Sequence, residues 1–469
     1  MAADRALPLR RRRGSTTLVA LTLTTALAVA VGSYLALLTQ GQRLAVRQFQ
    51  NERARELVQA GLEEALWALN QGVWTSSGPS SATAWTTSGT TRSITLNYGS
   101  LGHGASGEVA VSVANYASTG PVWPTITATA TITLSDGRSV TRRSQATTAP
   151  APLFGNAIAS SEAGVSFDAG GTVDSWNSDP DNNPATAAVP YSFTLGNAAN
   201  YAAVIAGRDD GSYGVVLTRA EVRGYVATFG QPVSYSISGS PPGKVLGPST
   251  ASGTNIDETR LGRSAFVPAS SVFSVNPPPT SGSAYGGLLS GVLNLVSSLV
   301  LAPLGVDLFK VNGDLDVQNT LFKPNLTVNR PLKIIVTGDL IIGGSSGKIT
   351  ITSAGSLELF VAGDVSIGGH GIDNQNVQPA KCAIYCTSSS TGDSVEYTAD
   401  ADFCGVIYAE NKPIDIRRNA NFYGALLSRR QIRFIGSATA PIFHYDTALR
   451  TTRFSGIKTP YVISQITEP

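Results

Sequence analysis

The hydrophobic pattern divides the chain into a helical N-terminal part and a β-rich remainder. Residues 18–38 form an uncharged, mainly apolar stretch, and apolar residues recur at helical spacing over residues 57–69. The first stretch is long enough to cross the hydrocarbon core as a helix. The second makes a single apolar stripe that can pack on a domain. Because Gly72 ends this pattern, we predict one membrane α-helix over residues 15–72, half in lipid and half on protein.

Period-two alternation follows the helix. Segments such as TITATATITL alternate apolar and polar residues between Ser93 and Arg143, as half-buried strands do. Ser135-Asp136-Gly137-Arg138 has the composition of a hairpin turn, and a Thr-Ala-Pro-Ala-Pro stretch at residues 148–152 indicates a linker. We therefore predict a small antiparallel β domain over residues 73–150 that packs on the outer half of the helix.

An internal repeat appears later in the chain. The segments VNGDLDV (311–317), VTGDLII (336–342) and VAGDVSI (361–367) recur at intervals of 25 residues. A fixed interval with the same Gly-Asp-apolar signature is typical of a repeat architecture in which each unit buries its apolar face only by stacking on its neighbours. We predict coils of a β-solenoid, with Gly-Asp at each corner and Val, Leu and Ile in the interior.

The interval shortens towards the C-terminus. Phe403 and Phe422 begin two similar segments 19 residues apart, and the segment from Phe154 has the same rhythm. The fold class predicted for this mainly-β region is a right-handed parallel β-solenoid with an insertion, and an ordinary β-sandwich is the alternative. The predicted parts are a basic leader (1–14), the helix (15–72), the antiparallel domain (73–150), the first solenoid strands (151–178), the insertion (179–303), the main solenoid (304–450) and a C-terminal tail (451–469).

The insertion contains one strongly apolar segment, residues 286–306. It could be a second membrane helix, but Asn294 and the serines beside it weaken that interpretation. Pro303 would end a helix here, and no basic cluster flanks the segment to retain either end in the cytoplasm. We predict a helix near residues 286–302 that caps or flanks the solenoid.

The distribution of charge indicates the compartment. Charged residues make up only 14% of the chain and the formal net charge is +2, which argues against nucleic acid as a partner. The arginines at positions 10–13 precede the apolar stretch and should stay in the cytoplasm, so the rest of the chain lies outside it. A cleaved secretory signal is the alternative, but the apolar run has no Ala-x-Ala exit.

The N-terminal segment resembles a known family. Arg13-Gly14, the apolar helix and the segment ARELVQAGLEEALWALN (54–70) are similar to PilX-like type IV pilus minor pilins and pilin-like assembly proteins. The resemblance implies that prepilin peptidase cuts after Gly14 and leaves Ser15 as the new N-terminus. Val19 stands where major pilins carry a glutamate.

The C-terminal half resembles a β-rich envelope domain of unassigned function that follows PilX-like N-termini. The segments that carry this resemblance are GGTVDSWNS (170–178), the Gly-Asp repeats and FHYDTAL (443–449). It supports the predicted architecture and implies no known chemistry.

Candidate chemistry is sparse. His103, His370 and His444 have no metal-ligand spacing, so we predict turn, cap or surface groups and no catalytic residue. The densest acidic segment contains Asp174, Asp179 and Asp181, whose oxygens could bind Ca²⁺. Turn formation is the favoured reading of that segment, because no glutamate completes a calcium loop.

The three cysteines lie close together in sequence. As a strand, CAIYC keeps Cys382 and Cys386 on one face but about 13 Å apart, too far for a disulfide. Cys404 follows Cys386 by 18 residues, close to the length of the shorter repeat. We therefore predict a Cys386–Cys404 disulfide.

These observations favour a non-enzymatic, pilin-like protein of the bacterial inner membrane. It would cross the membrane once, with its C-terminal region in the periplasm or exposed on a pilus, and its partners would be pilin-like subunits, pilus assembly proteins and prepilin peptidase. One alternative is a membrane-anchored β-helix enzyme acting on polysaccharide, with Asp415, Arg417, Arg429 and Arg433 on one face. Another is an adhesin that binds glycans or proteins.

Overall fold

The computed structural model describes most of the chain after the leader. The described residues are 15–74, 84–102, 104–116, 123–168, 170–181, 183, 186–192, 200–208, 214–228, 233–235, 243–248, 256–261, 274–275, 308–321, 323–417, 420–436, 442–452, 454, 457–458 and 460–468. The chain divides into two compact units: residues 1–149 with 461–469, and residues 150–460.

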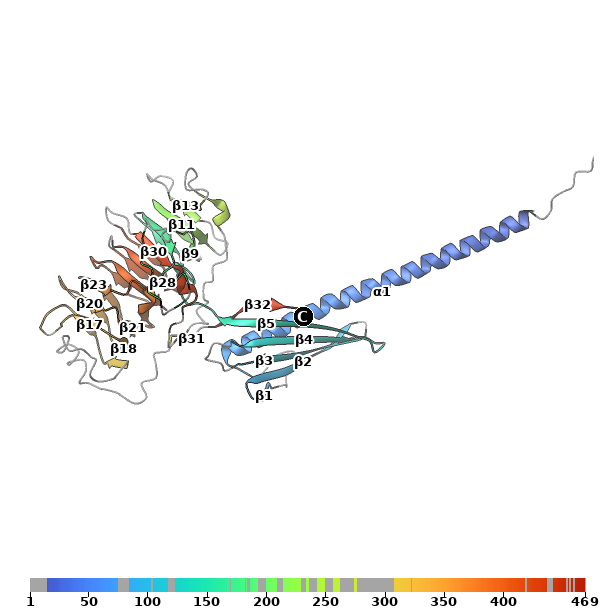
Figure 1. The fold of residues 1–469 in the computed structure, drawn as a ribbon, viewed down its shortest axis with the longest axis horizontal. Coiled ribbons are helices and arrows are strands. Elements are labelled where there is room, and N and C mark those ends of the chain that lie inside the picture. Colours follow the sequence, from blue (N-terminus) through green and yellow to red (C-terminus); the bar gives the residue numbers. More distant parts are fainter. Residues whose placement is uncertain are drawn as a thin grey trace, which may run out of the picture. The chain divides into compact units, whose positions relative to one another are not determined.

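The first unit begins with one continuous helix, α1 (Ser15–Gln71) (Figure 1). Its 57 residues give a length of about 86 Å. Residues 16–49 are exposed, whereas the C-terminal half buries a stripe that includes Leu57, Leu62 and Leu69. The helix predicted over residues 15–72 is therefore present, and its apolar stripe faces the protein as expected.

A six-stranded sheet packs on this half of α1. Its order is β1 (Thr86–Ser88), β2 (Thr91–Gly102), β3 (Ala105–Ala114), β4 (Thr125–Thr133), β5 (Ser139–Pro150) and β32 (Tyr461–Thr467). Strands β1 to β5 pair antiparallel, as predicted. Buried residues alternate with more exposed ones along β3 and β4, and the buried ones share one apolar core with the helix.

The sixth strand comes from the far end of the chain. Hydrogen bonds join Ser144 to Thr467 and Thr147 to Ser464, and the side chain of Asn70 bonds both the N–H and the carbonyl of Tyr461, at 2.7 and 3.0 Å. The predicted C-terminal tail is thus an edge strand of the first unit. The second unit is inserted in the sequence between β5 and β32, two neighbouring strands.

The second unit is built from parallel strands. The largest sheet contains β15 (Leu308–Val311), β18 (Pro331–Val336), β21 (Ser356–Val361), β24 (Cys382–Cys386), β26 (Phe403–Ala409), β28 (Phe422–Ser428), β30 (Ile442–Asp446), β8 (Gly171–Trp176), β11 (Ala220–Ala227), β9 (Ala203–Gly207) and β6 (Ile158–Ser160), with β13 (Lys244–Leu246) beside β11. The second contains β16 (Leu315–Val317), β19 (Leu340–Ile342), β22 (Val365–Ile367), β25 (Val395–Tyr397), β27 (Ile414–Ile416), β29 (Ile432–Phe434), β7 (Val165–Phe167), β10 (Val215–Leu217) and β12 (Val233–Tyr235).

Smaller elements complete this unit. A third parallel sheet contains β17 (Leu326–Val328), β20 (Lys348–Ile351) and β23 (Gly371–Asn374), and β14 (Ser274–Val275) pairs antiparallel with β31 (Ile457–Lys458). Short 3₁₀ turns are η1 (Glu258–Arg260), η3 (Pro379–Lys381) and η4 (Thr447–Arg450). From β15 to β23 the chain visits the three parallel sheets in turn, so each circuit adds one strand to each sheet (Figure 1).

The Gly-Asp repeat sets the register between these circuits. Leu315 pairs with Leu340 and Leu340 with Val365, and all three are buried, as predicted from the 25-residue interval. The N–H of Gly338 donates to the carbonyl of Gly313 at 2.9 Å, and the N–H of Gly363 to that of Gly338 at the same distance. A Cβ on either donor would lie within 3 Å of the backbone of the glycine before it, which explains why this corner requires glycine.

The aspartates that follow these glycines also form a row. The backbone N–H of Asp339 donates to Asp314 Oδ1 at 2.8 Å, and that of Asp364 to Asp339 Oδ1 at 2.7 Å. Each of these two carboxylates therefore accepts a hydrogen bond from the next corner. Such bonds offset the repulsion between stacked like charges.

Two boundaries predicted for this region are wrong. Strands β6 and β7 pair with β28 and β29, so residues 158–167 stack on the C-terminal end of the repeat and not ahead of residue 304. Strands β9 to β13 belong to the same parallel sheets, although the prediction placed them in an insertion over residues 179–303. Sequence order and stacking order differ because any exposed parallel edge can accept a strand from a distant segment. The helix predicted near residues 286–302 lies outside the described residues.

Candidate functional site

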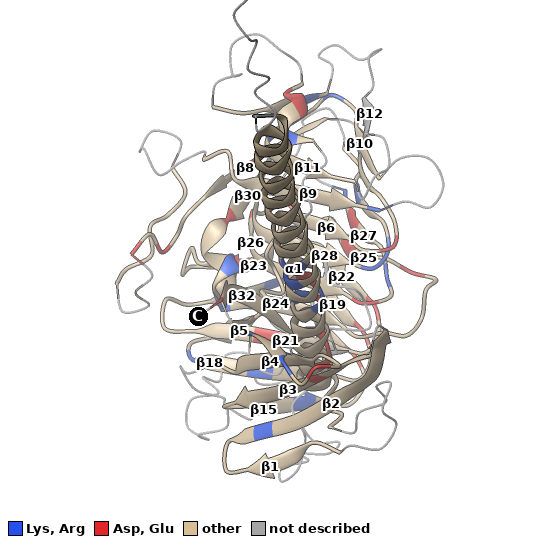
Figure 2. Cartoon of the chain, turned by 90° about the vertical axis from the view of Figure 1, so that its right-hand side faces the viewer, with Lys and Arg blue, Asp and Glu red and all other residues tan. Residues whose placement is uncertain are grey.

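The exposed half of α1 is the first candidate functional surface. From Ser15 to Gln42 it carries no charged residue, and Figure 2 shows the helix in tan along this stretch. Its most apolar window has a mean hydropathy of 1.9, and none of that window is buried within the protein. By length and composition this helix can cross a membrane.

The polar residues of this stretch are satisfied within the helix. The hydroxyls of Thr22, Thr24 and Thr25 donate to backbone carbonyls three or four residues earlier, as do those of Ser33 and Thr39, at 2.7–3.0 Å. In lipid no water is available to bond a hydroxyl, so such internal bonds remove the cost of placing it there. The sequence therefore suits the helix to an apolar environment despite its threonines.

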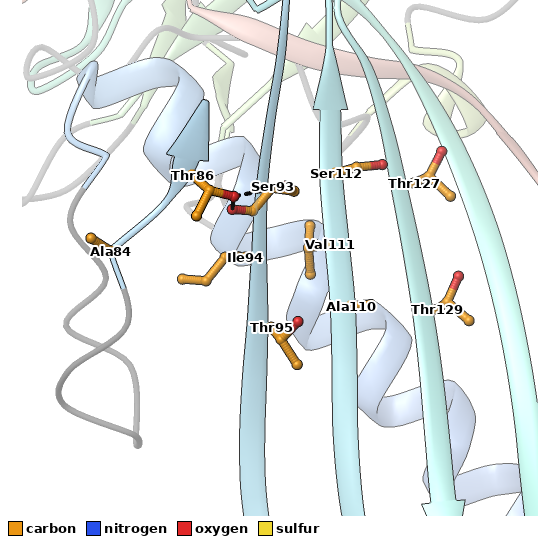
Figure 3. Close-up of a pocket in the computed structure, with 10 residues that line it drawn as sticks. All are labelled: Ala84, Thr86, Ser93, Ile94, Thr95, Ala110, Val111, Ser112, Thr127 and Thr129. Atoms are coloured by element: carbon orange, nitrogen blue, oxygen red, sulfur yellow. Dashed lines mark hydrogen bonds between the residues drawn. The ribbon is translucent and has the colours of Figure 1, made fainter. Parts of the chain in front are cut away.

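Two hollows occur in the first unit. One of about 380 Å³ lies on the sheet, and its lining, which includes Thr95, Ser112 and Thr129, has no titratable side chain (Figure 3). The other, about 700 Å³, lies between α1, β5 and β32; Val58, Leu62 and further apolar residues line it beside charged ones such as Arg55 and Arg142. Neither combines a nucleophile with a base. The second can accommodate an apolar segment with a charged edge.

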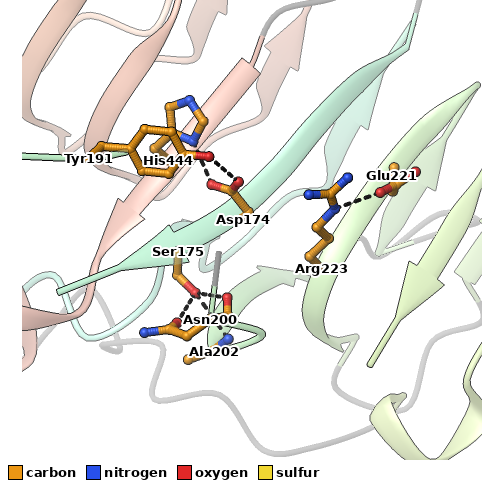
Figure 4. Close-up of polar contacts among 8 residues, drawn as sticks. All are labelled: Asp174, Ser175, Tyr191, Asn200, Ala202, Glu221, Arg223 and His444. Carbon is orange, nitrogen blue, oxygen red and sulfur yellow. Dashed lines mark hydrogen bonds and ion pairs between the residues drawn. The ribbon is translucent and has the colours of Figure 1, made fainter. Parts of the chain in front are cut away.

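A buried polar cluster is the main candidate site of the second unit. Strands β8 and β30 are neighbours, and their register places Asp174 opposite His444. Asp174 Oδ1 lies 2.5 Å from His444 Nδ1, and the hydroxyl of Tyr191 donates to Asp174 Oδ2 at 2.7 Å (Figure 4). Both strand side chains are at least 94% buried. An ionised Asp174 would hold the proton of His444 on Nδ1.

Aromatic rings enclose this pair. The ring of Tyr191 lies over the imidazole of His444, with 3.7 Å between centroids, and Tyr423 is 4.8 Å from it on the other neighbouring strand. Trp176 packs edge-on against both tyrosines. Burial, followed by the hydrogen bond to Asp174, raises the pKa of Tyr191, so its phenol stays protonated and remains a donor.

The neighbouring polar groups satisfy one another. Arg223 pairs with Glu221 at 2.7 Å, and the hydroxyl of Ser175 donates to the carbonyl of Asn200 at 2.5 Å (Figure 4). Ser175 also accepts from the N–H of Ala202 at 3.0 Å. Its oxygen is therefore engaged with backbone and not with His444. The cluster joins β8, β30 and the segment that carries Tyr191, and it lacks the serine–histidine contact of a hydrolase.

The structure places the predicted histidines differently. His444 is buried on a strand and bonded to Asp174, so its assignment as a turn, cap or surface group was wrong. His370 is exposed in the turn before β23, where its N–H donates to Gly347 O at 3.0 Å. His103 lies outside the described residues. The two motifs that contain Asp174 and His444 were noticed in the sequence, but nothing in it indicated that they would meet.

The proposed calcium ligands do not converge. Asp174 bonds His444 and Tyr191, whereas Asp179 and Asp181 both accept a hydrogen bond from the N–H of Asn183, at 2.9 and 3.2 Å. Within the described part of the chain, no three His, Cys, Asp or Glu side chains are arranged to hold a metal. The calcium prediction is therefore wrong for these residues, and the turn interpretation describes Asp179 and Asp181.

The predicted disulfide is also wrong. Strand register places Cys386 opposite Ala409, five residues beyond Cys404, and all three cysteines are free thiols. Five residues of strand correspond to about 16 Å, too far for a disulfide. The similarity in interval had suggested the pairing, but the fourth and fifth circuits align by their C-terminal ends, two residues out of that register. Burial raises the pKa of Cys382 to about 12 and that of Cys386 to about 11.

The residues considered for polysaccharide chemistry are engaged with one another. Asp415 is fully buried and accepts two hydrogen bonds from Arg433, both at 2.7 Å, and one from Arg417 at 3.0 Å. Arg429 bonds Glu162 at 2.7 Å. A carboxylate with no exposed surface cannot reach a substrate, so this face does not provide the acid–base pair that glycoside hydrolysis needs.

The predicted cleavage site is at the boundary of the described chain. Gly14 lies outside the described residues, and Ser15 is the first residue of α1.

Comparisons with known proteins give limited information. A family model described as a domain of unknown function (DUF7305) matches residues 308–452. A solved structure of the competence-associated pilin ComZ from Thermus thermophilus aligns with 89% of this chain and 97% of its own, at 11% identity. Its TM-score is 0.26, which is too low to support an argument about fold or function. No curated protein matches the sequence.

Proposed function

We propose that this chain is a non-enzymatic, pilin-like envelope protein that acts in the assembly or surface presentation of a type IV pilus or a related secretion filament. The observation that carries the proposal is the division of α1. Its first half is exposed, uncharged and apolar, and its second half packs on an antiparallel sheet. A soluble domain would have no use for an exposed apolar helix of this length.

The N-terminal residues supply the processing step of this proposal. Prepilin peptidase would cut between Gly14 and Ser15, and Ser15 would begin the mature helix. The arginines at positions 10–13 would stay in the cytoplasm, so that both folded units lie in the periplasm or on a filament. Inner-membrane insertion as a single span precedes assembly with other pilin-like subunits.

The second unit would be the presented part. Its parallel sheets, with one strand added to each sheet per circuit, are the arrangement expected of a β-solenoid, and a right-handed path would follow the usual hand of parallel crossovers. Because it is inserted between two adjacent strands of the first unit, it is connected to that unit by two chain segments.

Mass spectrometry of the mature N-terminus tests the proposal. The protein should begin at Ser15 in cells that contain prepilin peptidase and retain the leader in cells that lack it. As a matched control, Gly14→Val should keep the leader in both strains, because the peptidase requires the small residue before the cut. An intact Met1 in every strain, or a cut after Leu38, would contradict pilin-like processing.

Filament association tests the second step. Sheared filaments from a strain that contains the protein should carry it, and filaments from a Gly14→Val strain should not. Recovery of the protein only in the inner-membrane fraction of both strains would favour a static membrane protein over a filament component.

A further inference from the structure

Lys412 is the most unusual ionisable residue in the described part of the second unit. It lies in the short segment between β26 and β27, and its side chain has no exposed surface. A lysine seldom loses all contact with water, because burial of an ammonium group costs far more than burial of an aliphatic chain. Something specific must therefore hold the amine in place.

The partner of the amine is Asp364. Lys412 Nζ is in contact with Asp364 Oδ1, yet Nζ makes no hydrogen bond of acceptable geometry with any described atom. The other short lysine pair of this unit differs, because Lys323 Nζ donates a regular hydrogen bond to Asp316 and its side chain is 42% exposed. The buried pair therefore has the proximity of a salt bridge without its hydrogen-bond geometry.

The fold creates the space for this contact. Asp364 belongs to the corner between β21 and β22 and Lys412 to the corner two circuits further on. The corner between them, residues 387–394, has eight residues, whereas residues 362–364 and 410–413 make their corners with three and four. The longer segment lets the side chain of Lys412 pass the intervening circuit. Asn411 bonds this segment through Ser388 O at 3.1 Å and so fixes its path.

We propose that the side chains of Lys412 and Asp364 are joined by an isopeptide bond. Transfer of one proton from the ammonium to the carboxylate gives a neutral amine and a carboxylic acid, the pair that a buried site favours. Nζ then bonds to Cγ of Asp364, the Cγ–OH bond breaks, and the hydroxyl leaves with one amine hydrogen as water. No oxidant, reductant or other reactant is required.

The surroundings of Asp364 support this step. Its backbone N–H donates to Asp339 Oδ1 at 2.7 Å, which holds a second carboxylate beside it, and like charges in one row disfavour two ionised groups. The resulting amide would link the third circuit to the fifth, 48 residues apart in sequence. A covalent link along the stack would suit a protein that bears load on a filament, although the bond itself does not depend on the proposed function.

Peptide mapping of the purified full-length chain tests the bond. The expected product is a branched peptide that contains Asp364 and Lys412 and is lighter than its two parts by one water molecule. The full-length Lys412→Met and Asp364→Ala variants should regain that mass, whereas Lys323→Met should keep the branched peptide.

Two results would overturn the proposal. One is recovery of Asp364 and Lys412 only in separate linear peptides from the unaltered protein. The other is a water loss that persists in Lys412→Met, since it would arise elsewhere. The measurement on the unaltered chain is decisive even if a variant fails to fold.

Discussion

The antiparallel sheet of the first unit and the parallel sheets of the second bury their strands in different ways. In β4 buried and partly exposed residues alternate strictly, because one face packs on α1. In β28 six of the seven residues are buried, so the strand is covered on both faces. A strand with one buried face depends on its helix, whereas a strand in the stacked circuits depends on the strands before and after it.

The largest expected effect breaks the stacked circuits. Leu340→Asp places a carboxylate at a position that is fully buried between Leu315 and Val365 and should cost about 5 kcal/mol or more of the free energy of unfolding. The protease resistance of residues 150–460 should be lost. Ile341→Asp, one residue along and only partly buried, should keep it, because its side chain points to the other face. Equal loss in both variants would contradict the register.

A smaller effect is expected at the buried polar cluster. Asp174→Ala leaves the imidazole of His444 and the hydroxyl of Tyr191 without their shared acceptor, which should cost about 3 kcal/mol. Thermal unfolding followed by near-ultraviolet circular dichroism would report it, since the rings of Tyr191 and Trp176 belong to the cluster.

Asp181→Ala is the matched control for this cluster. Asp181 is an exposed aspartate of the same segment, so its loss should change the midpoint of unfolding little. Added calcium should not raise the midpoint of the unaltered protein, and a rise that Asp181→Ala abolishes would restore the calcium site.

The first unit can be disrupted at the contact between helix and sheet. A Cβ on Gly61 would lie 2.7 Å from Val109 Cγ1 and 3.0 Å from Val111 Cγ2, so Gly61→Leu should separate α1 from β3 and cost about 1–3 kcal/mol. Gly41→Leu is the control, because nothing lies within 4 Å of its Cβ. The melting of the first unit should shift only for Gly61→Leu, while the second unit keeps its protease resistance in both.

The cysteines give the smallest effect, on reactivity alone. The pKa of Cys386 is raised to about 11, so below that pH its thiol stays protonated and only about 10⁻³ of it is thiolate at pH 8. Cys382 and Cys404 are raised as well. A thiol reagent should therefore label the folded protein very slowly at pH 8 and label three sites after unfolding without reductant. Labelling of one site would instead indicate a disulfide.

Sequence patterns predicted the parts of this protein that depend on near neighbours. Helix α1 and the alternation in β2 to β5 follow from local periodicity, and the 25-residue interval predicted which leucines and glycines stack. The pairing of Asp174 with His444 could not be predicted, because the two residues are 270 positions apart and no interval relates them. The contact between Lys412 and Asp364 was missed because it skips a circuit.

The sequence by itself determined that the protein has one apolar helix, an antiparallel sheet and a stack of parallel circuits, because helix period, strand alternation and repeat length are properties of consecutive residues. Only the tertiary structure decided which segment occupies each edge. The layer next to β28 combines β30 with β6, and the last strand of the first sheet is β32. A strand edge offers the same backbone donors and acceptors to any segment, so its partner is chosen by packing across the whole chain.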